Sequence, residues 1–198
     1  MRALLLVDIQ NDFMPSGRLP VAEGDAIIEP VNRIIGGYPL VVASQDWHPA
    51  GHESFASAHA GKKPFDVINL HGLEQVLWPD HCIAGSSGAA FHSELNTTSI
   101  AAVFRKGMDK QTDSYSAFYD NGRRRSTQLA AYLRAHGVTD IDVAGLAADF
   151  CVYFSMADAL AEGFRVRLLE HATRAIDAAG FAAKKAELLA HPNFSLAD

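Results

Sequence analysis

The chain has 198 residues, of which 48% are hydrophobic, and a formal net charge of -6. This composition is typical of a folded protein with one sizeable core, and we expect a single domain over residues 1–198. The negative charge argues against nucleic acid or an anionic membrane as the main partner. Phosphate groups are bound by clustered Lys and Arg, and the one basic cluster, Arg123 to Arg125, lies among polar residues.

The sequence also gives no sign of export. The apolar run near the N-terminus, Ala3 to Val7, is too short for a signal sequence and is followed by Asp8. No run approaches membrane-spanning length. The two cysteines, Cys82 and Cys151, lie in unrelated local contexts, which favours a reducing compartment over a disulfide framework. We therefore expect a cytoplasmic protein with no membrane partner.

Strand-length apolar runs and helical periods alternate along the first part of the chain. Ala3 to Val7 is the first predicted strand. A helix is predicted over Asp25 to Ile35, because its apolar residues lie on one stripe, and Gly36-Gly37 ends it. Leu40 to Ala43 is the second predicted strand.

Residues 45–94 break this alternation, because they are rich in His, Pro, Gly and Ser and have only weak periodicity. In a compact domain, a loop of that length is usually functional or disordered. This segment holds six of the nine histidines and both tryptophans, a composition that argues against disorder. We interpret it as an insertion that builds a site.

The alternation resumes after this insertion. Strands are predicted at Ile100 to Phe104, Ile141 to Ala144 and Val166 to Leu169, and helices at Ser126 to His136 and Phe150 to Leu160. Near-continuous apolar runs are typical of strands that are covered on both faces. The sequence therefore predicts an α/β fold, a doubly wound three-layer α/β/α domain with a mainly parallel sheet and right-handed crossovers.

Polar residues that can take part in catalysis or bind a ligand follow four of the predicted strands. Asp8 follows the first strand, Asp46 and His48 the second and Lys106 the third, and Cys151 lies shortly after the fourth. In open α/β sheets, ligands bind beyond the carboxyl ends of the strands. Each residue alone has an ordinary structural explanation, such as a turn for an aspartate or core packing for a cysteine. An acid, a lysine and a cysteine at one sheet edge are less easily explained by coincidence.

Cys151 lies where a strand turns into a helix, within the segment Gly145 to Val152. The helix dipole and the free amides at a helix N-terminus favour a thiolate, and a neighbouring Lys106 ammonium would favour it further. Asp8 is placed to accept the thiol proton. The same free amides suit the oxyanion that forms when a thiolate attacks an amide carbonyl. The turn thus offers both a nucleophile and an oxyanion site.

Asp46, His48 and His81 are candidate ligands of a divalent metal ion, with His52 close behind. Imidazole and carboxylate suit Zn, Fe or Mn. The Asp-x-His spacing is weakly specific by itself, because residues i and i+2 of any extended segment share a face. Cys82, beside His81, is a possible ligand, but we favour a structural role for it. The other histidines lack such neighbours and are expected on the surface or as structural residues: His59, His71, His92, His136, His171 and His191.

Six motifs together resemble those of the nicotinamidases in the isochorismatase-like cysteine hydrolase superfamily, over nearly the whole chain. The motifs are Asp8-Ile9-Gln10-Asn11-Asp12-Phe13, Ser44-Gln45-Asp46-Trp47-His48-Pro49, Trp78-Pro79-Asp80-His81-Cys82, Lys106-Gly107, Asp113-Ser114-Tyr115-Ser116-Ala117-Phe118 and the Cys151 turn. The resemblance implies an isochorismatase-like fold. It also implies hydrolysis of the small molecule nicotinamide, and of pyrazinamide, to the acid and ammonia in NAD salvage.

The resemblance further implies roles for single residues. Asp8, Lys106 and Cys151 would form a catalytic triad. A metal, with zinc favoured over iron or manganese, would bind to Asp46, His48 and His81. A cis peptide is expected at Leu146-Ala147, and the amides of Ala147 and Cys151 would donate to the oxyanion. The ring pocket would be lined by aromatic residues whose positions fit core packing equally well: Phe13, Trp78 and Tyr115.

Some features depart from the family pattern or stay open. Ala148 stands where the family commonly has Thr, which removes a hydroxyl from the turn. An additional metal ligand varies among relatives, and His52, Glu53 and Ser54 all lie within reach, with His52 favoured. The oligomeric state, including a homo-oligomer, stays open.

Three alternative functions fit these motifs less well than nicotinamide hydrolysis does. Other members of the superfamily hydrolyse other small substrates, such as isochorismate or N-carbamoyl compounds, but as a group they do not need the Asp-x-His and distant His set. A non-catalytic protein on the same fold would not need Asp8, Lys106 and Cys151 together. A zinc peptidase is disfavoured by the lack of a His-Glu-x-x-His helix.

Overall fold

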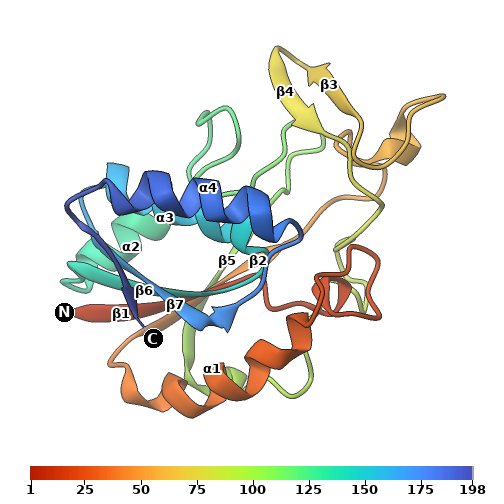
Figure 1. Ribbon diagram of the computed structural model, residues 1–198. Helices are drawn as coiled ribbons and strands as arrows, with labels where there is room; N and C mark the ends of the chain where they lie inside the picture. Colours follow the sequence, from red (N-terminus) through yellow and green to blue (C-terminus); the bar gives the residue numbers. More distant parts are fainter. Residues whose placement is uncertain (198) are drawn as a thin grey trace.

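Six parallel strands form the central sheet, in the order β5-β2-β1-β6-β7-β8. The computed structural model describes residues 1–197, and Figure 1 shows how its elements are arranged. The strands are β1 (Arg2–Val7), β2 (Val41–Asp46), β5 (Ile100–Lys106), β6 (Asp140–Gly145), β7 (Arg165–Thr173) and β8 (Phe194–Ala197). The predicted parallel sheet is confirmed, and each of the five predicted strands lies in it.

Helices cover both faces of this sheet and give the fold three layers (Figure 1). One face carries α1, and the other carries α2, α3 and α4. Alternate residues of β1 enter the two cores, since Leu5 packs on the side of α2 and α3 and Leu4 packs on the side of α1. Burial on both faces explains why this strand is apolar throughout. The helices are α1 (Ile28–Ile34), α2 (Leu129–Ala135), α3 (Tyr153–Ala161) and α4 (Ala178–Leu189).

The predicted helices begin at different residues in the structure. The helix predicted over Asp25 to Ile35 is split into a 3-10 turn, Gly24–Ile27, and α1. The helix predicted from Ser126 begins at Leu129. The Ser126 and Thr127 hydroxyls each accept a hydrogen bond from the backbone amide two residues further along the chain. This local bonding competes with helix formation.

Three parts of the structure have no counterpart in the sequence analysis: α4, β8 and a hairpin of β3 (Val67–Leu70) and β4 (Leu73–Val76). The reason is a weak apolar pattern. In α4 only Leu188 is buried. The hairpin lies between β2 and β5 in the chain and projects away from the sheet in Figure 1, so little of β3 is buried. None of the helices over residues 1–197 has the length and apolar character needed to cross a membrane.

Candidate active site and metal centre

The four polar positions that follow the strands meet at one edge of the sheet. Lys106 lies at the centre, because its Nζ is 2.8 Å from Asp8 Oδ2, 2.8 Å from Asp46 Oδ1 and 3.4 Å from Cys151 Sγ. All four residues are buried. Parallel pairing causes this convergence, since Asp46 of β2 stands beside Lys106 of β5 in register, and β1 and β6 end side by side. The predicted grouping of Asp8, Lys106 and Cys151 is therefore present in the structure.

Burial and neighbouring charges set the protonation of the lysine and its acids. Burial lowers the pKa of Lys106, but Asp46 and Asp8 outweigh this effect and hold that pKa well above its usual range. Burial likewise raises the pKa of Asp46, yet Lys106 and His48 hold it well below its usual range. Lys106 is therefore an ammonium that faces an ionised Asp46. A buried ammonium of this kind needs its carboxylate partners.

Burial has different consequences for the Cys151 thiol and for Asp8 beside it. Burial raises the pKa of the Cys151 thiol well above its usual range, and Lys106 opposes this only in part. Burial also raises the pKa of Asp8, whose Oδ1 accepts a 2.6 Å hydrogen bond from Ser44. Lys106 thus lowers the pKa of the thiol, as expected, but desolvation outweighs this effect. Burial therefore opposes the thiolate at Cys151 and makes the Asp8 carboxylate more basic.

The turn that carries Cys151 is a π-helical segment, Ala148–Val152, that leads into α3. Single π-helical turns are frequent at functional sites. The peptide Leu146-Ala147 is cis, as the resemblance implied. Within residues 1–197, the amide of Ala147 donates to no other residue, whereas its carbonyl accepts from Phe150 and Val152.

Gly145, at the end of β6, brings this turn close to β1. Its φ is +125°, and a Cβ at this position would collide with the backbone of Val7. Only glycine combines this conformation with so close an approach. The glycine thus allows the nucleophile turn to lie directly against the strand that carries Asp8.

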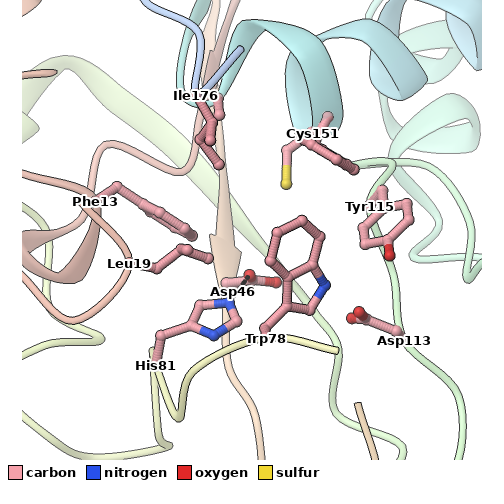
Figure 2. Close-up of a pocket in the computed structure, with 11 residues that line it drawn as sticks. Phe13, Leu19, Asp46, Trp78, His81, Asp113, Tyr115, Cys151 and Ile176 are labelled. Carbon is pink, nitrogen blue, oxygen red and sulfur yellow. Dashed lines mark ion pairs between the residues drawn. The ribbon is translucent and has the colours of Figure 1, made fainter. Parts of the chain in front are cut away.

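A cavity opens in front of the Cys151 sulfur. Figure 2 shows the sulfur pointing into it, with Phe13 and Tyr115 on two sides and His81 beyond Asp46. A carboxylate oxygen of Asp46 lies within 4.8 Å of the sulfur. The three aromatic residues predicted to line a ring pocket all line this cavity, as does Ala147. Four lining residues were not predicted as site residues: Leu19, Asp113, Phe150 and Ile176. Asp113 and Phe150 lie within the quoted motifs, whereas Leu19 and Ile176 had no signal in the sequence.

Asp46, His48 and His81 present three ligand atoms to one point. The Nε2 atoms of His48 and His81 lie 3.3 Å and 3.5 Å from Asp46 Oδ2. Each histidine directs its Nδ1 at a backbone carbonyl, Gly107 O at 3.0 Å and Pro79 O at 2.8 Å, so the proton of the neutral ring lies on Nδ1 and Nε2 carries a lone pair. Two lone pairs and a carboxylate in a buried group fit a divalent metal ion.

His52 lies outside this group of three, although it was predicted as an additional ligand. It belongs instead to an adjacent group with His48 and Asp113. Its Nδ1 accepts a hydrogen bond from the backbone N–H of Ser54 at 3.0 Å. The role of His52 as an additional ligand stays a prediction.

The remaining cysteine and histidines are where the sequence analysis expected them. Cys82 is buried, and its backbone N–H donates to Asp12 Oδ2 at 2.7 Å. Burial raises the pKa of its thiol well above the usual range, which suits a structural residue. The six histidines expected on the surface or as structural residues are all exposed or partly exposed.

Comparison with known proteins identifies the family. The family model that describes the isochorismatase domain matches residues 2–193. The chain belongs to the isochorismatase family. Its relatives include a nicotinamidase from Escherichia coli (strain K12), which is 49% identical over 180 residues that cover 89% of this chain and 84% of the relative.

Solved structures of family members have the same fold. A nicotinamidase/pyrazinamidase from Acinetobacter baumanii superposes with a TM-score of 0.94 at 40% identity, over 98% of this chain and 94% of that chain. A pyrazinamidase from Pyrococcus horikoshii, in complex with zinc, superposes with a TM-score of 0.81 at 33% identity, over 100% of this chain and 98% of that chain.

Proposed function

We propose that this chain is a nicotinamidase, which hydrolyses nicotinamide, and also pyrazinamide, to the acid and ammonia and serves NAD salvage. One observation carries the proposal: a buried cysteine, lysine and aspartate meet at the end of a cavity with aromatic walls. A flat ring with one carboxamide matches such a cavity in shape and chemistry. The relatives named above support the same substrate.

The first half of the reaction forms a thioester. Asp8 accepts the proton of the Cys151 thiol, and the sulfur attacks the amide carbonyl carbon. The oxygen of that carbonyl becomes an oxyanion, which accepts hydrogen bonds from the amides of Ala147 and Cys151. Asp8 then passes the proton to the departing nitrogen, the C–N bond breaks, and ammonia leaves. Lys106 compensates the negative charge on the sulfur.

The second half releases the acid. Asp8 accepts a proton from water, and the hydroxide so formed attacks the thioester carbon. The C–S bond breaks, and Asp8 gives its proton to the sulfur. The product acid is released, and the thiol of Cys151 is restored. In each half of the reaction, Asp8 accepts one proton and gives it up again. The reaction therefore consumes only water and the substrate.

The proposed metal ligands are Asp46, His48 and His81, with zinc as the favoured ion and iron or manganese as alternatives. When bound there, the metal supplies a Lewis acid for the ring nitrogen of the substrate. Two of these residues, Asp46 and His81, line the same cavity as Cys151. This supports a role for the ligand group in orienting the ring while Cys151 and Asp8 carry out the acyl transfer.

Ammonia release from nicotinamide tests the proposal, and the two free cysteines provide a matched pair. Cys151→Ala should abolish the release of ammonia and nicotinate, because it removes the nucleophile. Cys82→Ala removes an equally buried thiol that contacts no base, and it should keep the activity within about threefold, the scale of a small change away from the site. Substantial activity of Cys151→Ala would overturn the covalent mechanism.

A further inference from the structure

One buried polar side chain connects the projecting β3–β4 hairpin to the cavity wall. Gln75 of β4 is 2% exposed, whereas Glu74 beside it is exposed, since successive residues of a strand face opposite sides. A primary amide in such a place needs hydrogen-bond partners. Gln75 itself does not line the cavity.

The partners of Gln75 belong to the loop that follows β5. Its Nε2 lies 2.9 Å from Asp113 Oδ2, 3.0 Å from the Tyr115 hydroxyl and 2.8 Å from the Val76 carbonyl, and these three acceptors share its two hydrogens. Its Oε1 accepts from Asn121 Nδ2 at 3.4 Å, and Asn121 in turn accepts from the backbone N–H of Tyr115 at 2.9 Å. One side chain thus fixes the loop at three points.

Two of these partners form part of the cavity wall. Asp113 and Tyr115 both line the cavity, and the Tyr115 ring packs edge-on against Trp78 at 6.0 Å (Figure 2). Phe65, which precedes β3, packs edge-on against Trp78 from outside at 6.0 Å. The hairpin region therefore contacts two aromatic residues of this wall, Tyr115 through Gln75 and Trp78 through Phe65.

We propose that Gln75 is a positioning residue that holds Asp113 and Tyr115 in place and thereby sets which ring the cavity accepts. The inference rests on the proposed function for the identity of that ring. The donor is what matters. A buried carboxylate that loses a hydrogen bond relaxes towards other partners, and Tyr115 is then free to move with it.

Two substitutions of nearly the same size separate this role from space filling. Gln75→Met keeps the volume and removes the donor. Gln75→Glu keeps the shape and sets a second carboxylate against Asp113, where like charges repel. Glu74→Met is the matched control, because it makes the same side chain on the same strand but on the exposed face.

The expected result is a change in KM rather than in kcat. Gln75→Met and Gln75→Glu should raise KM for nicotinamide about tenfold or more, the usual consequence of losing a hydrogen bond to a charged group, and change kcat by less than about threefold. The rate at which iodoacetamide alkylates Cys151 should change by less than about threefold, because Gln75 contacts none of Asp8, Lys106 and Cys151. Glu74→Met should leave all three quantities unchanged. An unchanged KM in both Gln75 variants would overturn the proposal.

A double-mutant cycle checks that Gln75 acts through the wall. Tyr115→Phe keeps the ring but removes the acceptor, so its KM increase and that of Gln75→Met should combine to less than their product. A full product would overturn the proposal. If Gln75→Met does not fold, Tyr115→Phe replaces it, and an unchanged KM for that variant then counts against the inference.

A reading without substrate separates this inference from the proposed function. Acrylamide should quench tryptophan fluorescence more strongly in Gln75→Met than in the wild type or in Glu74→Met, since Trp78 loses a fixed neighbour. Wild-type protein that releases no ammonia from nicotinamide would overturn the proposed function and leave this measurement valid. Equal quenching in all three proteins would overturn the role of Gln75.

Discussion

At the scale of single residues, the site depends on one buried ammonium with three anionic or potentially anionic neighbours. Lys106 contacts Asp8, Asp46 and Cys151, and so it touches both the acyl-transfer group and a proposed metal ligand. Removal of any partner leaves a buried charge uncompensated. The residues of the triad should therefore act as one unit.

Paired substitutions test this dependence. Asp8→Asn and Lys106→Met should each lower kcat/KM for nicotinamide by about a hundredfold or more, the scale on which a proton-transfer group or a local charge contributes. The double variant should lose much less than the product of the two losses, because either change alone already disables the unit. Lys110→Met, which alters an exposed lysine nearby, serves as the control. Independent, multiplying losses would contradict a shared role.

At the scale of elements, the decisive piece is the link from β6 through Gly145 into the π-helical turn. The strand brings the chain to the sheet edge, and the turn sets Cys151 against the end of β1. Asp149, just before Cys151, accepts hydrogen bonds from the backbone amides of Ile176 and Asp177 at 2.9 Å each. The turn is thus anchored to the segment between β7 and α4 as well.

Two glycines with positive φ provide a test of this link. Gly145→Ala forces a side chain into the backbone of Val7 and should lower the free energy of unfolding by about 3 kcal/mol or more, from strain and overpacking together. Gly137→Ala, after α2, meets no atom within 4 Å and should cost about 1 kcal/mol, since only the conformation is unfavourable. Urea unfolding measures both. Equal losses would show that the close approach at Gly145 is unimportant.

Elements also show how far the sequence leads. The five predicted strands and the residues just after them could be found because strands buried on both faces leave a continuous apolar pattern. The hairpin, α4 and the wall residue Ile176 could not, because their places depend on contacts with distant parts of the chain and not on local periodicity. The raised pKa of Cys151 could not be predicted from the sequence either, because burial at the sheet edge depends on tertiary contacts.

At the scale of the whole molecule, the proposed metal joins separate parts of the fold. Asp46 ends β2 and His48 follows it, whereas His81 comes after the β3–β4 hairpin in the chain. A ligand that binds only the folded state stabilises it by mass action. The metal should therefore contribute to the stability of the protein as well as to its activity.

Thermal unfolding with and without a chelator tests this contribution. At a free zinc concentration about a thousandfold above Kd, the stabilisation is about 4 kcal/mol, which for a chain of this size corresponds to a Tm about 10 °C higher than in the metal-free protein. His48→Ala should lose this difference, whereas His136→Ala, which changes an exposed histidine outside the group, should keep it. A zinc-dependent shift of the same size in His48→Ala would contradict the assigned ligands.

The order of the strands in the sheet has a further consequence for synthesis on the ribosome. β1, the strand before Asp8, is synthesised well before β6, the strand before Cys151, although the two strands pair in the sheet. Contacts between segments so distant in the chain form slowly and only once both are available. The chain between them must therefore leave the exit tunnel before Asp8, Lys106 and Cys151 can meet, and a nascent chain that ends before β6 cannot assemble the proposed triad.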